Sequence, residues 1–119
     1  MAKSKNSRHT SAFLLLFLAE APAYGAQLLT RMNSDLPFCF SDSPSVYRSL
    51  QELEDNKLVE ARWETTGVSQ PRKWYSLTPK GWDALEDFKE DILKRRANFT
   101  FFLHHYELLN PNTPPSERR

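Results

Sequence analysis

Cysteine and glycine are both scarce in this chain, whose 119 residues include one cysteine, Cys39, and three glycines. A single thiol excludes an internal disulfide and a zinc site made of four cysteines. The glycine-rich loop that cradles phosphates in nucleotide-binding enzymes is also missing. A reducing, cytoplasmic location is therefore the simplest expectation.

Long hydrophobic runs are missing too. The longest, from Ala12 to Ala19, is much shorter than the roughly 20 residues that a membrane-spanning helix needs. Lys3, Lys5 and Arg8 precede it, as in a signal peptide, but Glu20 follows it directly and no small-residue cleavage motif is evident. We therefore expect no membrane partner.

Groups of residues that could catalyse a reaction or bind a metal ion are rare as well. No motif pairs a nucleophile with a base, so we predict no enzyme activity and no cofactor. His104 and His105 are adjacent and point about 100° apart on a helix, which disfavours a shared metal ion. Cys39 lies between Phe38 and Phe40. It is interpreted as a small buried hydrophobe, with a redox-sensing thiol as the alternative.

Net charge is small, +1 from 16 basic and 15 acidic residues, but the charges are segregated. The first nine residues are basic, and so is the stretch that contains Arg72, Lys73 and Lys80. Residues 83–91 are mainly acidic. This distribution favours a polarised surface, although ordinary solvated faces would give the same pattern.

Residues 1–10 are polar and lack periodicity, which predicts a basic N-terminal arm. Thr10 or Ser11 is expected to cap a first, mostly buried helix that ends at Pro22. A second helix is expected from Tyr24 to Asn33. Its predicted inward-facing residues are Ala26, Leu28, Leu29 and Met32.

A third helix is predicted to begin with Ser43 as its N-cap and Pro44 in its first turn, and to end near Asn56. Its apolar positions recur at intervals of three and four residues. They are Val46, Leu50 and Leu53. The opposite face is predicted to be exposed, and it carries Pro44, Ser45, Arg48, Gln51 and Glu52.

Two half-buried strands are predicted next. Val59, Ala61 and Trp63 alternate with charged residues, and Tyr75 and Leu77 continue this period-two pattern in a second strand. The intervening residues 65–71 contain glycine and proline. The pair is therefore predicted to be a β-hairpin with a long polar tip.

A long final helix over residues 79–109 follows, with Thr78 as its cap and Pro79 in its first turn. Its seam keeps a 3-4 spacing that favours packing along a second copy of the chain; folding back onto its own core is the alternative. The seam residues are Leu85, Phe88, Ile92, Arg95, Phe99, Phe102, Tyr106 and Leu109. All of them except Arg95 and Leu109 are assigned to dimerisation, and residues 110–119 are predicted to be a disordered tail.

The fold class follows from this order of elements. We predict a mainly α protein with a small β-hairpin, in which residues 11–78 form a winged helix-turn-helix domain and residues 79–109 a C-terminal dimerisation helix.

From Ser11 to about Phe88 the sequence also resembles the PadR family of bacterial transcriptional regulators. The matching stretches are FLAEAPAYGAQLL, SPSVYRSLQELEDNKLVEARW and QPRKWYSLTPKGWDALEDF. The resemblance implies a dimer that binds an operator in double-stranded DNA, with its recognition helices in successive major grooves and its wings along the minor groove or the backbone.

The residues assigned to DNA binding lie on the third helix, on the wing and in the arm. They are Ser43, Ser45, Tyr47, Arg48, Gln51, Arg72, Lys73, Lys3, Lys5 and Arg8. Arg48 is suited to a guanine edge, and the wing and arm cations are suited to phosphates. For Tyr47 packing is an equal alternative, and Lys73 is otherwise a plain exposed strand residue.

Function is therefore predicted to be that of a dimeric, sequence-specific transcriptional regulator, a repressor released by a small effector. The resemblance implies an aromatic effector at the dimer centre, and the candidate lining residues are Phe13, Trp82, Phe88 and Ile92. The alternative is a winged-helix protein–protein module that does not bind DNA.

Overall fold

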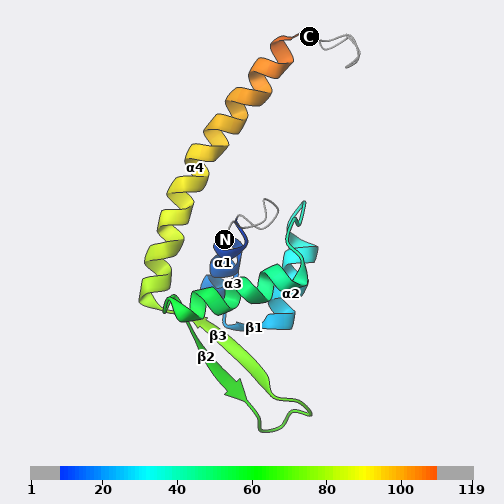
Figure 1. Cartoon of the computed structure of the whole chain (residues 1–119), viewed down its shortest axis with the longest axis vertical. Helices are drawn as coiled ribbons and strands as arrows, with labels where there is room; N and C mark the ends of the chain where they lie inside the picture. The colour runs from blue at the N-terminus through cyan, green and yellow to red at the C-terminus, as the bar shows by residue number, and fades with distance from the viewer. Residues whose placement is uncertain (1–8, 110–119) are drawn as a thin grey trace. The chain divides into compact units, whose positions relative to one another are not determined.

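A computed structural model describes residues 9–109, which fall into two compact units, one ending at Glu86 and one beginning at Asp87. The elements follow one another along the chain as labelled in Figure 1. They are α1 (Thr10–Glu20), β1 (Ala23–Tyr24), α2 (Gly25–Asp35), α3 (Ser43–Asp55), β2 (Val59–Glu64), β3 (Arg72–Leu77) and α4 (Pro79–Leu108). The predicted class, mainly helical with a small antiparallel sheet, is confirmed.

The sheet has three strands rather than the predicted two. Its order is β1-β3-β2, and β1 contributes two residues, Ala23 and Tyr24, which pair with Tyr75 and Trp74. The second helix therefore begins at Gly25, one residue later than predicted. A two-residue strand is too short to produce a period-two pattern, so only the pairing with β3 identifies it.

The core of the first unit lies among its three short helices and the sheet. Leu14, Leu28 and Val46, one from each of these helices, are fully buried, and Val59 and Tyr75 are the buried residues of the sheet. α1 is buried on most sides, as its apolar sequence predicts, although Leu16 is exposed.

Two side chains that were predicted to face inward are exposed. Ala26 lies two residues before Leu28, which places it roughly 160° away on the helix surface. Trp63 is 60% exposed, and it pairs with Lys73 towards the free end of the hairpin, beyond the buried Val59.

The N-cap of α3 is Asp42, not Ser43 as predicted. The Asp42 carboxylate accepts a hydrogen bond of 2.9 Å from the Ser45 amide. Hydrogen bonds from the Ser45 side chain and amide lower the pKa of Asp42. Ser43 is instead the first helical residue, followed by Pro44 in the first turn.

The start of α1 also differs from the prediction. Thr10 is the first helical residue, and His9 occupies the cap position without a side-chain cap. The buried Thr10 hydroxyl bonds to the Ser41 hydroxyl instead. Thr10 thus ties α1 to the segment that leads into α3.

α3 ends in a tight turn with Lys57 in the left-handed region, at φ 65°. The Leu58 amide donates to the Leu53 carbonyl (2.9 Å) and the Lys57 amide to the Glu54 carbonyl (3.0 Å). This pair of bonds is a Schellman motif, whose left-handed position most often holds glycine. Here the turn directs the chain from α3 into β2.

α4 begins against this same turn. The Thr78 hydroxyl accepts from the Gly81 amide (3.0 Å) and donates to the Lys57 carbonyl (2.7 Å), so the predicted cap is confirmed. A Cβ on Gly81 would lie 2.1 Å from the Leu58 carbonyl oxygen. Only glycine permits this close approach.

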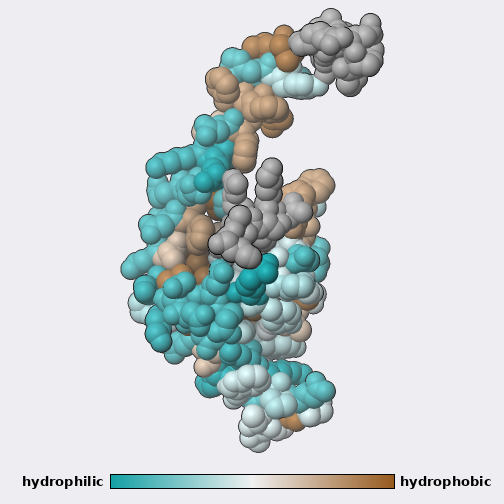
Figure 2. Space-filling model, in the orientation of Figure 1, coloured by the Kyte–Doolittle hydropathy of each residue, from teal (hydrophilic) through white to brown (hydrophobic). Residues whose placement is uncertain are grey.

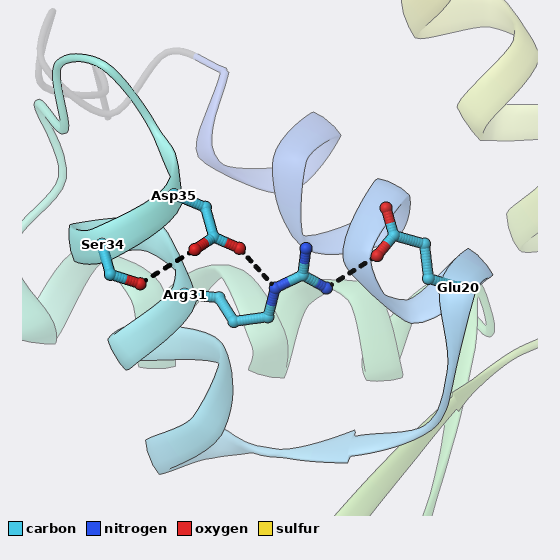
Figure 3. A network of polar contacts seen from close by, with 4 residues as sticks. All are labelled: Glu20, Arg31, Ser34 and Asp35. Carbon is cyan, nitrogen blue, oxygen red and sulfur yellow. Dashed lines mark hydrogen bonds and ion pairs between the residues drawn. The ribbon is translucent and has the colours of Figure 1, made fainter.

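A polar network joins the end of α1 to α2 (Figure 3). The Arg31 guanidinium pairs with Glu20 (2.9 Å) and Asp35 (2.8 Å), and it lies 4.0 Å from the centre of the Phe17 ring. These carboxylates raise the pKa of Arg31. This cation is therefore engaged within the fold.

α4 is one continuous helix of 30 residues, about 45 Å long. Within residues 9–109 no helix has both the length and the apolar character that crossing a bilayer requires.

Replacing the observed cap should distinguish it from the predicted one. Asp42→Ala should lower the thermal unfolding midpoint by about 4 °C, while Ser43→Ala should leave it nearly unchanged. Because hydrogen bonding lowers the folded-state pKa of Asp42, the difference should be present at neutral pH and shrink as the pH falls through that value. Equal effects of the two substitutions would contradict the assignment.

Relieving the left-handed residue should stabilise the first unit. Lys57→Gly should raise the free energy of unfolding by about 1 kcal/mol, because glycine adopts this conformation without a Cβ clash. Lys57→Ala is the matched control, since it removes the same charge and keeps the strain. Urea unfolding of both variants measures the difference, and a gain in the alanine variant of equal size would point to charge instead.

Candidate functional site

The candidate surface combines the exposed side of α3 with the β2–β3 hairpin that follows it in the chain (Figure 1). Along α3 an arc of side chains is exposed and, apart from Pro44, polar. It consists of Pro44, Tyr47, Arg48, Gln51 and Asp55. This arrangement offers hydrogen-bond donors and acceptors on a rigid helix.

Ser45 does not lie on this surface, contrary to the prediction. It is only 5% exposed, and Ser49 beside it on the next turn is buried as well. The buried side of α3 thus extends beyond its apolar stripe, because small polar side chains complete it. The Ser45 hydroxyl accepts a hydrogen bond from the Nη2 nitrogen of the Arg48 guanidinium at 3.2 Å. Ser45 therefore helps to fix the position of the Arg48 side chain.

Arg48 and Gln51 are exposed and anchored by single hydrogen bonds. Arg48 uses one of its five N–H donors on Ser45, and the Gln51 amide donates to Asp55 at 2.9 Å. Most of their hydrogen-bonding capacity is directed away from the fold. Both residues are placed where the sequence predicted them.

Tyr47 both packs and remains exposed. A Cβ on Gly25 would lie 2.5 Å from the Tyr47 ring, so the ring rests directly on the start of α2. The side chain is nevertheless 46% exposed. The packing alternative is confirmed, and a contact to phosphate stays a prediction.

Lys73 is neither a plain exposed strand residue nor an unengaged cation. Its ammonium lies 2.8 Å from a Glu54 carboxylate oxygen, and both side chains are about one-quarter to one-third exposed. The same ammonium lies over the rings of Trp63 and Tyr75, at 5.9 and 5.6 Å. The contact with the Glu54 carboxylate is the main cause of a raised Lys73 pKa.

Arg72 points to the other face of the sheet. Its guanidinium lies 4.9 Å from the Tyr24 ring centre, and Tyr24 meets Trp74 edge-on at 5.0 Å. The Trp74 indole donates to Glu64 at 2.9 Å. This aromatic support orients the exposed Arg72.

Several residues of this surface escaped the sequence reasoning. They are Tyr24, Glu54, Trp63 and Trp74. Alternation along the strands placed Trp63 and Trp74 on opposite faces, but it gave neither residue a role in the candidate surface. The pairing of Glu54 with Lys73 leaves no signal in the sequence, because 19 positions separate them.

A groove of about 500 Å³ runs between the start of α2, Tyr47 and the hairpin. Aromatic rings and cations line it together with the polar tip of the hairpin. Its lining includes Tyr24, Gly25, Tyr47, Trp63, Arg72 and Lys73.

The remaining predicted DNA contacts are Ser43, which is exposed at the start of α3, and Lys3, Lys5 and Arg8. These three basic residues lie outside the described part of the chain. Their role stays a prediction.

The second unit presents a different surface. Figure 2 shows hydrophobic side chains gathered on the C-terminal part of α4. Exposed apolar residues extend beyond the predicted seam, because Phe101, Leu103 and Leu108 are each more than 60% exposed. The seam residues Phe99, Phe102 and Tyr106 are exposed as well.

The four effector candidates are distributed over the two units. Phe13 is half-buried and Trp82 is 54% exposed in the first unit. Phe88 is half-buried and Ile92 is 37% exposed in the second. Their joint role stays a prediction.

Cys39 is half-buried, and its Sγ lies 3.4 Å from the Ser41 carbonyl oxygen. Its neighbours Phe38 and Phe40 are largely exposed and stack on each other, and Cys39 is not the fully buried hydrophobe that was expected. Across residues 9–109, no group of three or more His, Cys, Asp or Glu side chains could hold a metal ion.

Comparisons with known proteins support the same architecture. The sequence profile of the transcriptional regulator PadR-like family matches residues 14–87. A PadR family transcription regulator from hypervirulent Clostridium difficile is similar, with a TM-score of 0.69 and 22% identity over 80% of this chain and 98% of that one. A PadR-like transcriptional regulator from Bacillus cereus gives a TM-score of 0.67 and 26% identity over 80% and 91% of the two chains.

A third solved structure, a conserved protein of unknown function described as a potential transcriptional factor, has a TM-score of 0.76 and 24% identity. The likeness covers 92% of this chain and 96% of that one. No curated protein matches this sequence.

Proposed function

Because the chain belongs to the PadR-like family of transcriptional regulators, we propose that it is a homodimer that represses transcription from an operator it binds. DNA-binding regulation is the activity of the family. The finer elements of the proposal are the residues that contact DNA, the dimer, repression and release by an effector. The observation that carries it is the exposed polar arc of α3 beside the hairpin.

Base recognition is assigned to α3. An α-helix fits the major groove, and arginine can donate two hydrogen bonds to a guanine edge. Arg48 is exposed, and one of its N–H groups donates a hydrogen bond to Ser45. The remaining N–H groups of the guanidinium are available to donate to a base. Gln51, one turn further along, supplies an amide suited to adenine.

Backbone contacts are assigned to the hairpin and the N-terminal arm. Arg72 is exposed at the hairpin and supported by the Tyr24 ring. An arginine in this position can neutralise a phosphate and release a counterion, which makes binding depend on salt. Lys3, Lys5 and Arg8 are proposed to neutralise further phosphates and so to increase the salt dependence of binding.

Two substitutions separate these roles. Arg48→Ala should weaken operator binding by about tenfold or more and relax specificity at one base pair. Arg72→Ala should weaken binding to all DNA sequences and reduce the salt slope, d log K/d log [salt], by about 0.9. Fluorescence anisotropy over a salt series, with operator and random duplexes, measures both effects.

Lys94→Ala is the control, because Lys94 is an exposed cation on α4 outside the α3–hairpin surface. It should leave affinity and slope unchanged. A wild-type protein that binds DNA without a salt slope, or an Arg48→Ala variant with undiminished affinity, contradicts the proposal. Stoichiometric copurification of another protein would then favour a protein–protein module.

Dimerisation is proposed through the exposed apolar side of α4. Monomeric soluble proteins rarely expose contiguous apolar patches larger than a few hundred Å². Here the exposed residues of the second unit include Ile92, Phe99, Phe102 and Tyr106, in the 3-4 spacing of a helix that packs along a partner. Leu85 and Phe88 begin the same seam and are half-buried.

Charges on this seam should produce a monomer. Phe99→Asp with Phe102→Asp should abolish self-association, because burying two carboxylates in an apolar interface is strongly unfavourable. Thr100→Asp with His104→Asp is the matched control, since these residues lie on the polar side of the same turns. Sedimentation velocity at several concentrations distinguishes the outcomes, and a persistent Phe99/Phe102 variant dimer would contradict the assignment.

Repression and effector release complete the proposal. A dimer that covers two half-sites about one helical turn apart can exclude the transcription machinery from the DNA it occupies. A small aromatic ligand is proposed to disfavour the DNA-binding arrangement, and Phe13, Trp82, Phe88 and Ile92 stay its candidate contacts. Both steps build on the dimer.

A further inference from the structure

The ion pair between Glu54 and Lys73 joins the last turn of α3 to the middle strand of the sheet. Glu54 lies one residue before the end of α3, and Lys73 lies on β3 opposite Trp63 of β2. The two charged atoms are 2.8 Å apart. The helix that presents the polar arc is therefore attached directly to the hairpin.

This contact is shielded more than an ordinary surface pair. The side chains are 26% and 31% exposed, and the Lys73 ammonium lies over the rings of Trp63 and Tyr75. Tyr75 itself is 7% exposed. Exposed ion pairs contribute little because water screens them, whereas an enclosed pair is costly to break.

The pair adds a side-chain connection between α3 and the hairpin. The two are also joined covalently through the Schellman turn at Lys57 and Leu58, and β3 is held by its pairing with β1. These contacts are made by the backbone and lie at the base of the hairpin. The Glu54–Lys73 contact lies further along β3, and it restricts the angle between α3 and the hairpin.

The same contact disfavours a role for Lys73 as a phosphate ligand. A phosphate close to the Lys73 ammonium would also lie close to the Glu54 carboxylate, and like charges repel. Pulling the ammonium away would leave the partly buried Glu54 carboxylate without this cation, which is unfavourable. Arg72 lies on the opposite face of β3, over the Tyr24 ring.

We propose that the Glu54–Lys73 pair is a brace that sets the orientation of the wing relative to α3. In this proposal, which rests on the proposed function, Lys73 is a positioning residue that tunes preference for operator over random DNA. Its charge compensates Glu54 rather than a DNA phosphate.

The test compares Lys73→Met, Glu54→Gln and the exchanged pair Glu54→Lys with Lys73→Glu. Lys73→Met keeps an unbranched side chain, one heavy atom shorter, and removes the charge. Each single variant should weaken operator binding by about tenfold, the size typical of coupled contacts. The exchanged pair restores opposite charges at the same two positions, and it should recover the ratio of operator to random affinity.

The salt slope separates positioning from phosphate contact. Lys73→Met should leave the slope at its wild-type value, whereas a lost phosphate contact would reduce it by about 0.9, as expected for Arg72→Ala. A reduction of that size in Lys73→Met would overturn the proposal. So would an exchanged pair that folds but recovers none of the lost preference.

Amide hydrogen exchange in the free protein tests the brace without DNA. Exchange in β2 and β3 should be faster in both single variants and should return towards wild type in the exchanged pair. Unchanged exchange in the single variants would overturn the brace even if DNA binding is confirmed. Faster exchange in a protein that fails to bind DNA would instead retain the brace and reject the proposed function.

Discussion

The Leu58 carbonyl is the point on which the arrangement of the first unit depends. It accepts a hydrogen bond from the Thr78 amide (3.1 Å), and Gly81 approaches it without a side chain. The end of α3, the start of β2 and the first turn of α4 therefore meet at one backbone group. Moving any one of these elements would break its contact with the others at this carbonyl.

The cations of this chain have different roles despite their similar chemistry. Arg31 and Lys73 are used inside the fold, where they join α1 to α2 and α3 to β3. Arg48 and Arg72 instead present their guanidinium groups at the surface. The net charge of +1 therefore says little about DNA binding, because it counts structural and exposed charges alike.

Much of the fold follows from local patterns, because each pattern reports contacts between residues close in sequence. Three such local patterns are the apolar stripe of α3, the alternation in the hairpin and the Thr78 cap. The misplaced details depend on small steps along the chain. Asp42 caps where Ser43 was expected, and Ser45, directly before Val46 of the apolar stripe, is buried where an exposed residue was expected. For the candidate surface, Arg48 and Gln51 were predictable because helical geometry places them opposite the core.

The sequence by itself determined the order of helices and strands and the exposed apolar character of the last helix, since periodicity encodes which face of an element avoids water. Only the tertiary structure decided that Lys73 is paired with Glu54, that Tyr47 rests on Gly25 and that β1 joins the sheet. Each of these contacts joins residues far apart in the chain. Such contacts depend on how the elements pack, which no local pattern records.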